Sequence, residues 1–105
     1  MNEVIDEEVR RRSWCDVRLT DIAWAEEGRD LVLTWILHDN SVGILTCSWA
    51  HSINIAVTSS NNEGGYPLTY AAEFSKLKEN VWQVQFDFAS RGVVEFTCSG
   101  ISLET

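Results

Sequence analysis

The side chains best suited to chemistry lie together in one stretch of the chain, residues 34–51. This stretch holds both histidines, His38 and His51, together with Asp39, Cys47 and two of the five tryptophans. Histidine, cysteine and aspartate side chains bind zinc, and a cysteine within hydrogen-bond reach of a histidine can act as a nucleophile. The stretch therefore suggests two hypotheses, a metal site and a Cys–His pair, and the local fold decides between them.

The hydrophobic pattern of this stretch predicts a β-hairpin with its loop at residues 39–41. In this register, apolar side chains lie opposite one another on a single face of the hairpin. The expected pairs are Leu31 with Trp49, Leu33 with Cys47, and Trp35 with Leu45. Asn40 is the loop residue that best tolerates the left-handed backbone conformation of a tight turn.

The predicted hairpin separates the reactive side chains. Cys47 points to the apolar face, whereas His38 lies at the hairpin tip on the other face and His51 follows the strand. A zinc site needs four ligands at about 2.0–2.3 Å, so no metal site is expected, and Cys47 cannot pair with His38. The pair of Cys47 and His51 stays open, but a buried thiol that packs as a small hydrophobic side chain is the preferred interpretation.

Catalytic motifs are absent from the rest of the sequence, which has no G-x-S-x-G, H-E-x-x-H, Walker or Rossmann pattern. A pair of carboxylates assembled across strands, as in a glycosidase, stays open. We therefore predict a protein without enzymatic activity, metal or cofactor.

The whole chain predicts a mainly β fold in a single domain that spans residues 1–105. A short helix is expected at 2–12, where acidic residues precede basic ones, and antiparallel β structure at 16–105. The expected strands cover 16–24, 31–38, 42–49, 53–58, 68–77, 81–88, the segment through Val94, Phe96 and Cys98, and 101–103. About seven to eight short strands joined by turns are typical of an antiparallel β-sandwich or an open barrel.

Local features of the strands give further predictions. The apolar alternation slips between Leu19 and Ile22, which predicts a β-bulge near Thr20 and Asp21. A three-residue loop, Ser90-Arg91-Gly92, has glycine where a left-handed residue is needed; the expected pairs are Phe88 with Val94, Phe86 with Phe96, and Val84 with Cys98. The strands at 68–74 and 101–103 are expected at sheet edges, and the sequence leaves open a homodimer through one of them.

The net charge of −8 limits the classes of partner. Nucleic-acid binding is not expected, because phosphate contact needs clustered Lys and Arg, and no apolar run is long enough to cross a bilayer. Three widely spaced cysteines indicate reduced thiols, and the N-terminal residues lack the apolar core of a signal peptide. We therefore expect a cytoplasmic protein whose acidic surface either docks on a basic protein partner or simply keeps the chain soluble.

The five tryptophans are an unusual number for 105 residues. Trp35 and Trp82 alternate with aliphatic residues and are expected in the core, whereas Trp14, Trp24 and Trp49 lie near strand ends, where aromatic rings are often half exposed. These three either line the rim of the core or form a binding surface. The candidate binding residues are Trp24, Glu26, Glu27, Asp30, Trp49, His51, Glu63 and Tyr66. The alternative to a protein-binding module is a small-ligand-binding β domain with a tryptophan-lined pocket.

Two segments resemble a known group of proteins. The end of the chain, FDFASRGVVEFTCSGISLE, has the pattern F-x-F…F-x-C-x-x-I-x-L-E, and the beginning contains WCDVRLTDIAW. This arrangement is similar to small β-rich bacterial immunity-type proteins of polymorphic toxin systems. The resemblance implies an antiparallel β domain that binds and neutralises a toxin without catalysis. Cys15 stands where that family usually has a histidine, and no binding residues carry over, because the matching positions are expected in the core. An uncharacterised mobile-element protein of no known role remains an alternative.

Overall fold

The computed structural model describes residues 7–57 and 66–105. It contains one short helix and eight strands: α1 (Glu7–Arg11), β1 (Arg18–Ala25), β2 (Asp30–Ile36), β3 (Val42–Ser48), β4 (His51–Val57), β5 (Ala71–Lys78), β6 (Val81–Asp87), β7 (Gly92–Cys98) and β8 (Gly100–Glu104). The predicted mainly β, antiparallel fold is therefore confirmed. The helix expected at 2–12 is present over Glu7–Arg11, and residues 2–6 of that prediction lie outside the described residues.

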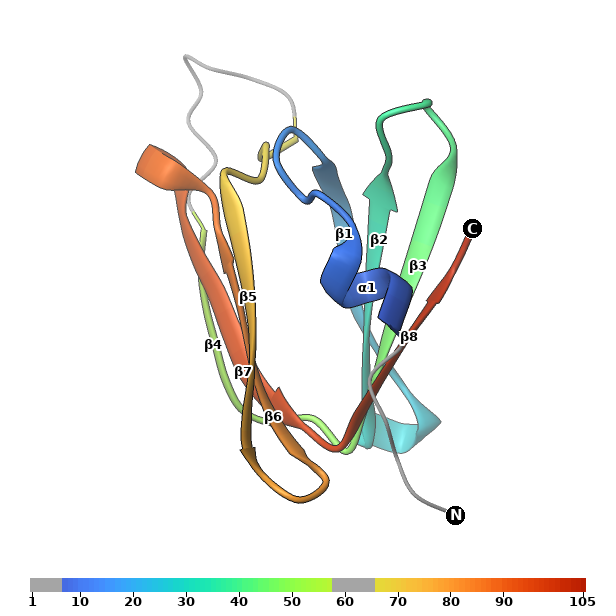
Figure 1. Cartoon of the computed structure of the whole chain (residues 1–105), viewed down its shortest axis with the longest axis vertical. Coiled ribbons are helices and arrows are strands. Elements are labelled where there is room, and N and C mark those ends of the chain that lie inside the picture. Colours follow the sequence, from blue (N-terminus) through green and yellow to red (C-terminus); the bar gives the residue numbers. More distant parts are fainter. Residues whose placement is uncertain (1–6, 58–65) are drawn as a thin grey trace.

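The strands form two four-stranded antiparallel sheets, in the orders β1-β2-β3-β8 and β4-β7-β6-β5. The two sheets face each other as a sandwich (Figure 1). The chain crosses between them twice, from β3 to β4 and from β7 to β8, and both crossings lie at the lower end of Figure 1. There, the Ser99 N–H donates to the Ser48 carbonyl oxygen at 2.8 Å. The segments β3–β4 and β7–β8 therefore cross side by side from one sheet to the other. They join the sheets at one end, which we call the crossover end.

The β2–β3 hairpin differs from its predicted register by two residues. Its pairs are Leu31 with Cys47, Leu33 with Leu45, and Trp35 with Gly43. The Leu37 N–H donates to the Ser41 carbonyl oxygen at 2.9 Å, so the loop is 38–40 rather than 39–41. The predicted left-handed Asn40 is confirmed, with φ 66°, but it is the last loop residue and not the middle one. Since a shift of two residues keeps each side chain on its face, the predicted faces of β2 and of residues 42–48 hold.

The β6–β7 hairpin shows the same shift. It pairs Phe86 with Val94, Val84 with Phe96, and Trp82 with Cys98. The Phe88 N–H donates to the Gly92 carbonyl oxygen at 2.8 Å, so the loop is 89–91 and not 90–92. The left-handed loop residue is Ala89, with φ 56°. Gly92 instead begins β7 at φ 119° and ψ −153°, a region open essentially to glycine alone.

Other predicted features of the sheets are confirmed. A register shift lies between Leu19 and Asp21 in β1, where the bulge was expected. Both β5 and β8 are edge strands, as predicted, and β1 and β4 form the other two edges. Within the described part of the chain, no helix is long and apolar enough to cross a membrane.

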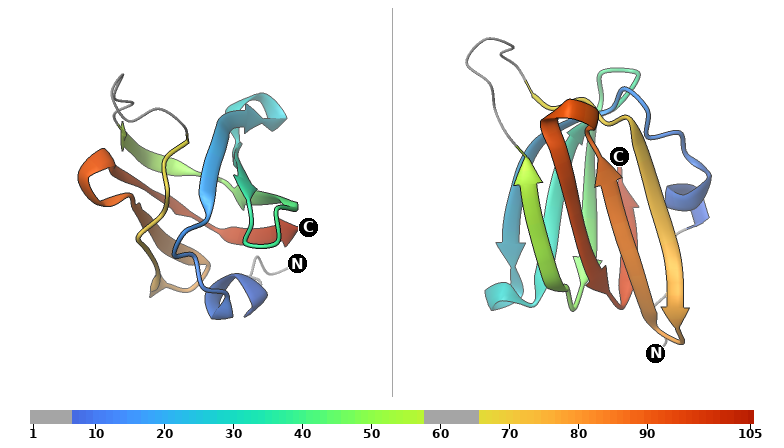
Figure 2. Two further views of the ribbon diagram at one scale, coloured as in Figure 1. Left: turned by 90° about the horizontal axis from the view of Figure 1, so that it is seen from above. Right: turned by 90° about the vertical axis from the view of Figure 1, so that its left-hand side faces the viewer.

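An aromatic cluster occupies the centre of the sandwich. The ring centroid of Trp35 lies 4.8 Å from that of Phe86 and 5.1 Å from that of Trp14. Trp14 also contacts Phe74 of β5, and its Nε1–H donates to the Val9 carbonyl oxygen at 2.9 Å. Because α1 and the segment after it lie on the side of β5 and β8 (Figure 2), Trp14 reaches the space between the sheets. Trp14 is 4% exposed, so of its two alternatives, packing at the core and a binding surface, the structure shows packing at the core. The predicted burial of Trp35 and Trp82 is confirmed.

Candidate functional site

The structure separates the histidines from the cysteine of residues 34–51. His38 is exposed at the β2–β3 hairpin tip, hydrogen-bonded through Nε2 to the Cys15 carbonyl oxygen. His51 is also exposed and lies next to the Trp49 carbonyl oxygen. Cys47 is fully buried, and burial together with the neighbouring Cys98 raises the pKa of its thiol. The interpretation of Cys47 as a buried core thiol is confirmed. In residues 7–57 and 66–105, no group of three His, Cys, Asp or Glu side chains could hold a metal ion.

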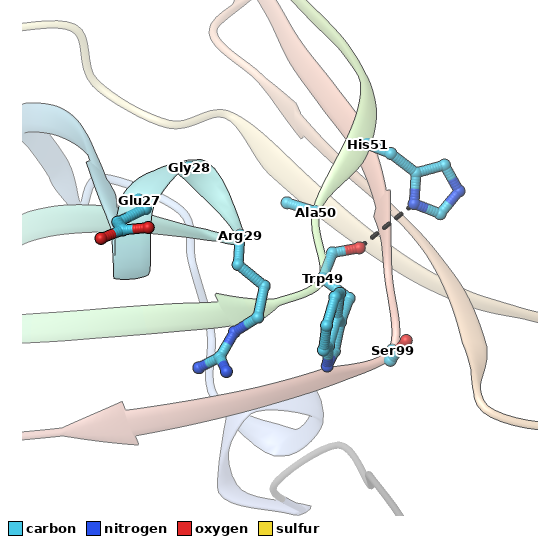
Figure 3. Close-up of a pocket in the computed structure, with 7 residues that line it drawn as sticks. All are labelled: Glu27, Gly28, Arg29, Trp49, Ala50, His51 and Ser99. Atoms are coloured by element: carbon cyan, nitrogen blue, oxygen red, sulfur yellow. Dashed lines mark hydrogen bonds between the residues drawn. The ribbon is translucent and has the colours of Figure 1, made fainter.

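The crossover end contains an open hollow of about 480 Å³. It lies between the β1–β2 turn and the β3–β4 crossing (Figure 3) and is lined by Glu27, Gly28, Arg29, Trp49, Ala50, His51 and Ser99. Trp49 has a left-handed backbone, with φ 55°, and this ends β3 at Ser48. The Trp49 ring is consequently 56% exposed, so its expected place on the apolar face opposite Leu31 is wrong.

A small network of polar contacts fixes Trp49. The Arg29 Nε and Nη2 each donate to one carboxylate oxygen of Asp30, both at 2.9 Å. The Asp30 Oδ1 also accepts the Trp49 N–H at 3.3 Å. The guanidinium carbon of Arg29 lies 5.3 Å from the centroid of the Trp49 ring, and the two side chains lie side by side in Figure 3. This is cation–π geometry. The network holds the β3–β4 crossing against the β1–β2 turn.

Asp30 therefore has a structural role, because it binds both Arg29 and the Trp49 backbone. It was expected in an exposed acidic turn, but it is 5% exposed. The hydrogen bonds from Arg29 are the largest cause that lowers the pKa of Asp30; the Trp49 N–H acts in the same direction, and burial acts against both. The exposed carboxylates of this turn are Glu26 and Glu27.

We expect Asp30→Asn to lower the free energy of unfolding at neutral pH by about 1–2 kcal/mol, because a neutral amide replaces a carboxylate that accepts three hydrogen bonds. The pKa of Asp30 is lower in the folded than in the unfolded chain. Its stabilisation is therefore complete above the unfolded pKa, about 4, and disappears as the pH falls through the folded value. Urea unfolding at about pH 7 and about pH 2.5 measures the difference. Glu27→Gln, an equal charge change at an exposed position, is the control; an equal loss from Asp30→Asn at both pH values would contradict the expectation.

The structure places the other candidate residues as follows. Trp24, at the end of β1, is 57% exposed, and Glu26 follows it in the turn. Glu27, Trp49 and His51 meet around the hollow of the crossover end. Tyr66 is 54% exposed and lines a different hollow with Leu19, Ile22 and Val57. Glu63 lies outside the described residues.

Sequence reasoning missed three surface residues. Arg29 covers the Trp49 ring, a contact between separate turns that no local pattern indicates. Val42 and Ile44 are exposed on the outer face of the first sheet, with 55% and 37% of their surface accessible. A signal for these two existed, because the alternation of residues 42–48 leaves Val42 and Ile44 on the face opposite Leu45 and Cys47.

Comparisons with known proteins support the fold. No protein-family model matches the chain, and no curated protein matches it. A solved structure, the crystal structure of an uncharacterized protein from Neisseria gonorrhoeae, is similar with a TM-score of 0.67 and 16% sequence identity. The similarity covers 87% of this chain and 92% of that chain. At this level of identity, the similarity concerns the fold alone.

Proposed function

We propose that the chain is a non-catalytic protein-binding module, an acidic inhibitor or immunity-type protein that docks on a basic protein partner in the cytoplasm. The docking surface consists of Trp24, Glu26, Glu27, Trp49 and His51 at the crossover end. The observation that carries the proposal is the exposure of two tryptophans, each by more than half, beside two exposed carboxylates.

The aromatic part of the docking surface supplies the binding energy. Tryptophan is the residue type most enriched among side chains that dominate protein–protein affinity. The Trp49 backbone is fixed through its N–H to Asp30, and its ring is covered on one side by Arg29. Side chains held in place before binding lose less entropy when a partner is bound. Trp49 is therefore the expected centre of the contact.

The charge of the chain favours a basic partner. With a net charge of −8, the protein attracts positively charged surfaces at long range and repels acidic ones. Glu27 lines the same hollow as Trp49, and Glu26 follows Trp24 in the turn, so a Lys or Arg of the partner would pair with these exposed carboxylates. Added salt should weaken the association, because it screens these charges.

Other functions have less support. The hollow at the crossover end, which Trp49 lines, is open, and Trp14, Trp35 and Trp82 are buried in the core, so a tryptophan-lined pocket for a small ligand has less support. Cys15, Cys47 and Cys98 are all free thiols, which is consistent with the cytoplasmic part of the proposal.

The test compares three baits in pull-downs from the native host at about 50 mM and about 500 mM salt. The wild type should retain a basic protein at low salt. Trp24→Ala/Trp49→Ala should lose it, because truncation of one central aromatic anchor costs about 2 kcal/mol or more, roughly 30-fold in affinity. Tyr66→Ala/Tyr70→Ala is the control, since both tyrosines are more than half exposed but lie outside the docking surface.

Titration of the retained protein against each purified bait then gives the dissociation constants. Equal affinities for the wild type and the tryptophan variant, or no retained protein at either salt concentration, would contradict the proposal. If a toxin gene neighbours the gene for this chain, its product is the first partner to titrate.

A further inference from the structure

We propose that the chain forms a two-fold symmetric dimer in which β4 pairs in antiparallel fashion with β4 of a second copy. β4 is seven residues long and lies at the edge of its sheet. One side of β4 pairs with β7, and on the other side no strand among the described residues pairs with it. Within residues 7–57 and 66–105, its outer row of backbone N–H and C=O groups therefore has no strand partner.

The four edge strands differ in how they are protected against such pairing. β1 has a bulge and the charged residues Arg18 and Asp21. β5 has Glu73 and two lysines as well as a register shift near its end. β8 has only five residues and contacts α1. β4 has a register shift as well, between His51 and Asn54. Its sequence, HSINIAV, contains no Asp, Glu, Lys, Arg or Pro, and the register is regular over residues 54–57. Because charges and short length protect the other edges, the part of β4 after its register shift is the edge best suited to pair.

The core-facing side chains of β4 are also incompletely covered. Ile55 lies opposite Val94, which is fully buried, yet Ile55 itself is 48% exposed. β1 lies across the sandwich from β4 on the same side (Figure 2), where Trp24 faces inward beside Leu31 and is 57% exposed. A second β4 in the same sheet would bring Ile53, Ile55 and Val57 of the two copies together and remove apolar surface from water.

Self-complementarity, together with the absence of charged residues from β4, favours a second copy as the occupant. Two chains with a net charge of −8 repel each other, so self-association needs a surface without carboxylates. β4 is such a surface, and the Asn54 Nδ2–H donates to the acid on the neighbouring strand, Glu95, at 3.4 Å. Antiparallel pairing of two identical strands is self-complementary, so it occupies both edges at once and closes the assembly at two copies.

Salt distinguishes this dimer from the proposed function. Salt weakens the attraction between an acidic protein and a basic partner, whereas it reduces the repulsion between two acidic copies and should strengthen the dimer. The pairing residues, 53–57, are not residues of the docking surface, although His51 of that surface begins β4.

The test is the molar mass of the full chain by sedimentation equilibrium, from about 10 μM to about 1 mM, at about 50 mM and about 500 mM salt. We expect the molar mass to rise with protein concentration towards twice that of one chain. This rise should occur at lower protein concentrations in high salt than in low salt. Ile55→Lys should raise the dimer dissociation constant at least tenfold, because it places two lysines close together in the paired edge. Leu77→Lys, an equal change at a 56% exposed residue of the β5 edge, should leave it unchanged.

Amide hydrogen exchange of the wild type provides a measurement that needs no variant. The β4 amides should exchange more slowly as the protein concentration rises, and the β5 amides should not. The mass of one chain at about 1 mM in both salts would overturn the proposal. A dimer that survives Ile55→Lys in a folded protein and is lost in Leu77→Lys would overturn it as well, and would assign the contact to β5.

Discussion

Trp14→Ala is expected to lower the free energy of unfolding by about 3–5 kcal/mol, the usual cost of truncating a large buried aromatic residue. Trp14 is 4% exposed although it belongs to no strand. Its ring centroid lies 5.1 Å from that of Trp35 and 5.4 Å from that of Phe86, so its removal leaves a cavity beside the central aromatic cluster. The Val9 carbonyl oxygen, which is buried with the ring, also loses its hydrogen bond.

Urea unfolding followed by far-UV circular dichroism measures this loss. Trp49→Ala is the matched control: it removes the same side chain from a position that is 56% exposed, and it should cost less than about 1 kcal/mol. Trp14→Phe keeps an aromatic ring but removes the Nε1–H donor, so its cost should lie between the other two. Equal costs for Trp14→Ala and Trp49→Ala would show that the segment after α1 does not close the core.

The core residues of the sheets could be predicted because their burial depends only on the alternation of side chains between the two faces of a strand. Alternation in 81–88 and in 31–38 assigned Trp35, Val84 and Phe86 to the buried face, and all three are fully buried. The cross-strand partners were wrong by two residues in both hairpins, because each loop ends one residue earlier than expected. In the β2–β3 loop the left-handed residue Asn40 was predicted correctly but its place in the loop was not, and in the β6–β7 loop the left-handed residue is Ala89.

The candidate site was less predictable because it depends on where strands end. The alternation of side chains placed Trp49 on the apolar face opposite Leu31, but its left-handed backbone turns the chain towards the second sheet. Asp30 was grouped with Glu26 and Glu27 by sequence proximity. Its burial follows from the hydrogen bond to the Trp49 N–H, which forms only when the β3–β4 crossing lies against the β1–β2 turn. Contacts between turns that are distant in the sequence produce no periodic pattern of residue types.

Gly92→Ala is expected to cost roughly 2–4 kcal/mol, because the backbone and a neighbouring strand both exclude a side chain there. Gly92 has φ 119°, and a Cβ atom at this position would lie 1.7 Å from the Ala56 carbonyl oxygen of β4. Since Gly92 pairs with Val57, relief of this overlap requires the end of β4 to move away from β7. The hairpin loop and the sheet pairing therefore both depend on one glycine.

Gly28→Ala separates the two contributions to this cost. Gly28 also has a positive φ, 94°, but a Cβ atom there would meet nothing within 4 Å. It should therefore cost only the backbone strain, about 1 kcal/mol. Urea unfolding of both variants gives the difference, which measures how closely β4 and β7 approach at this point. If the two substitutions cost the same, strain alone accounts for Gly92. If Gly92→Ala costs more, the overlap with Ala56 is confirmed, and faster amide exchange in β4 than in β5 should accompany it, because the displaced strand lies at the edge of its sheet.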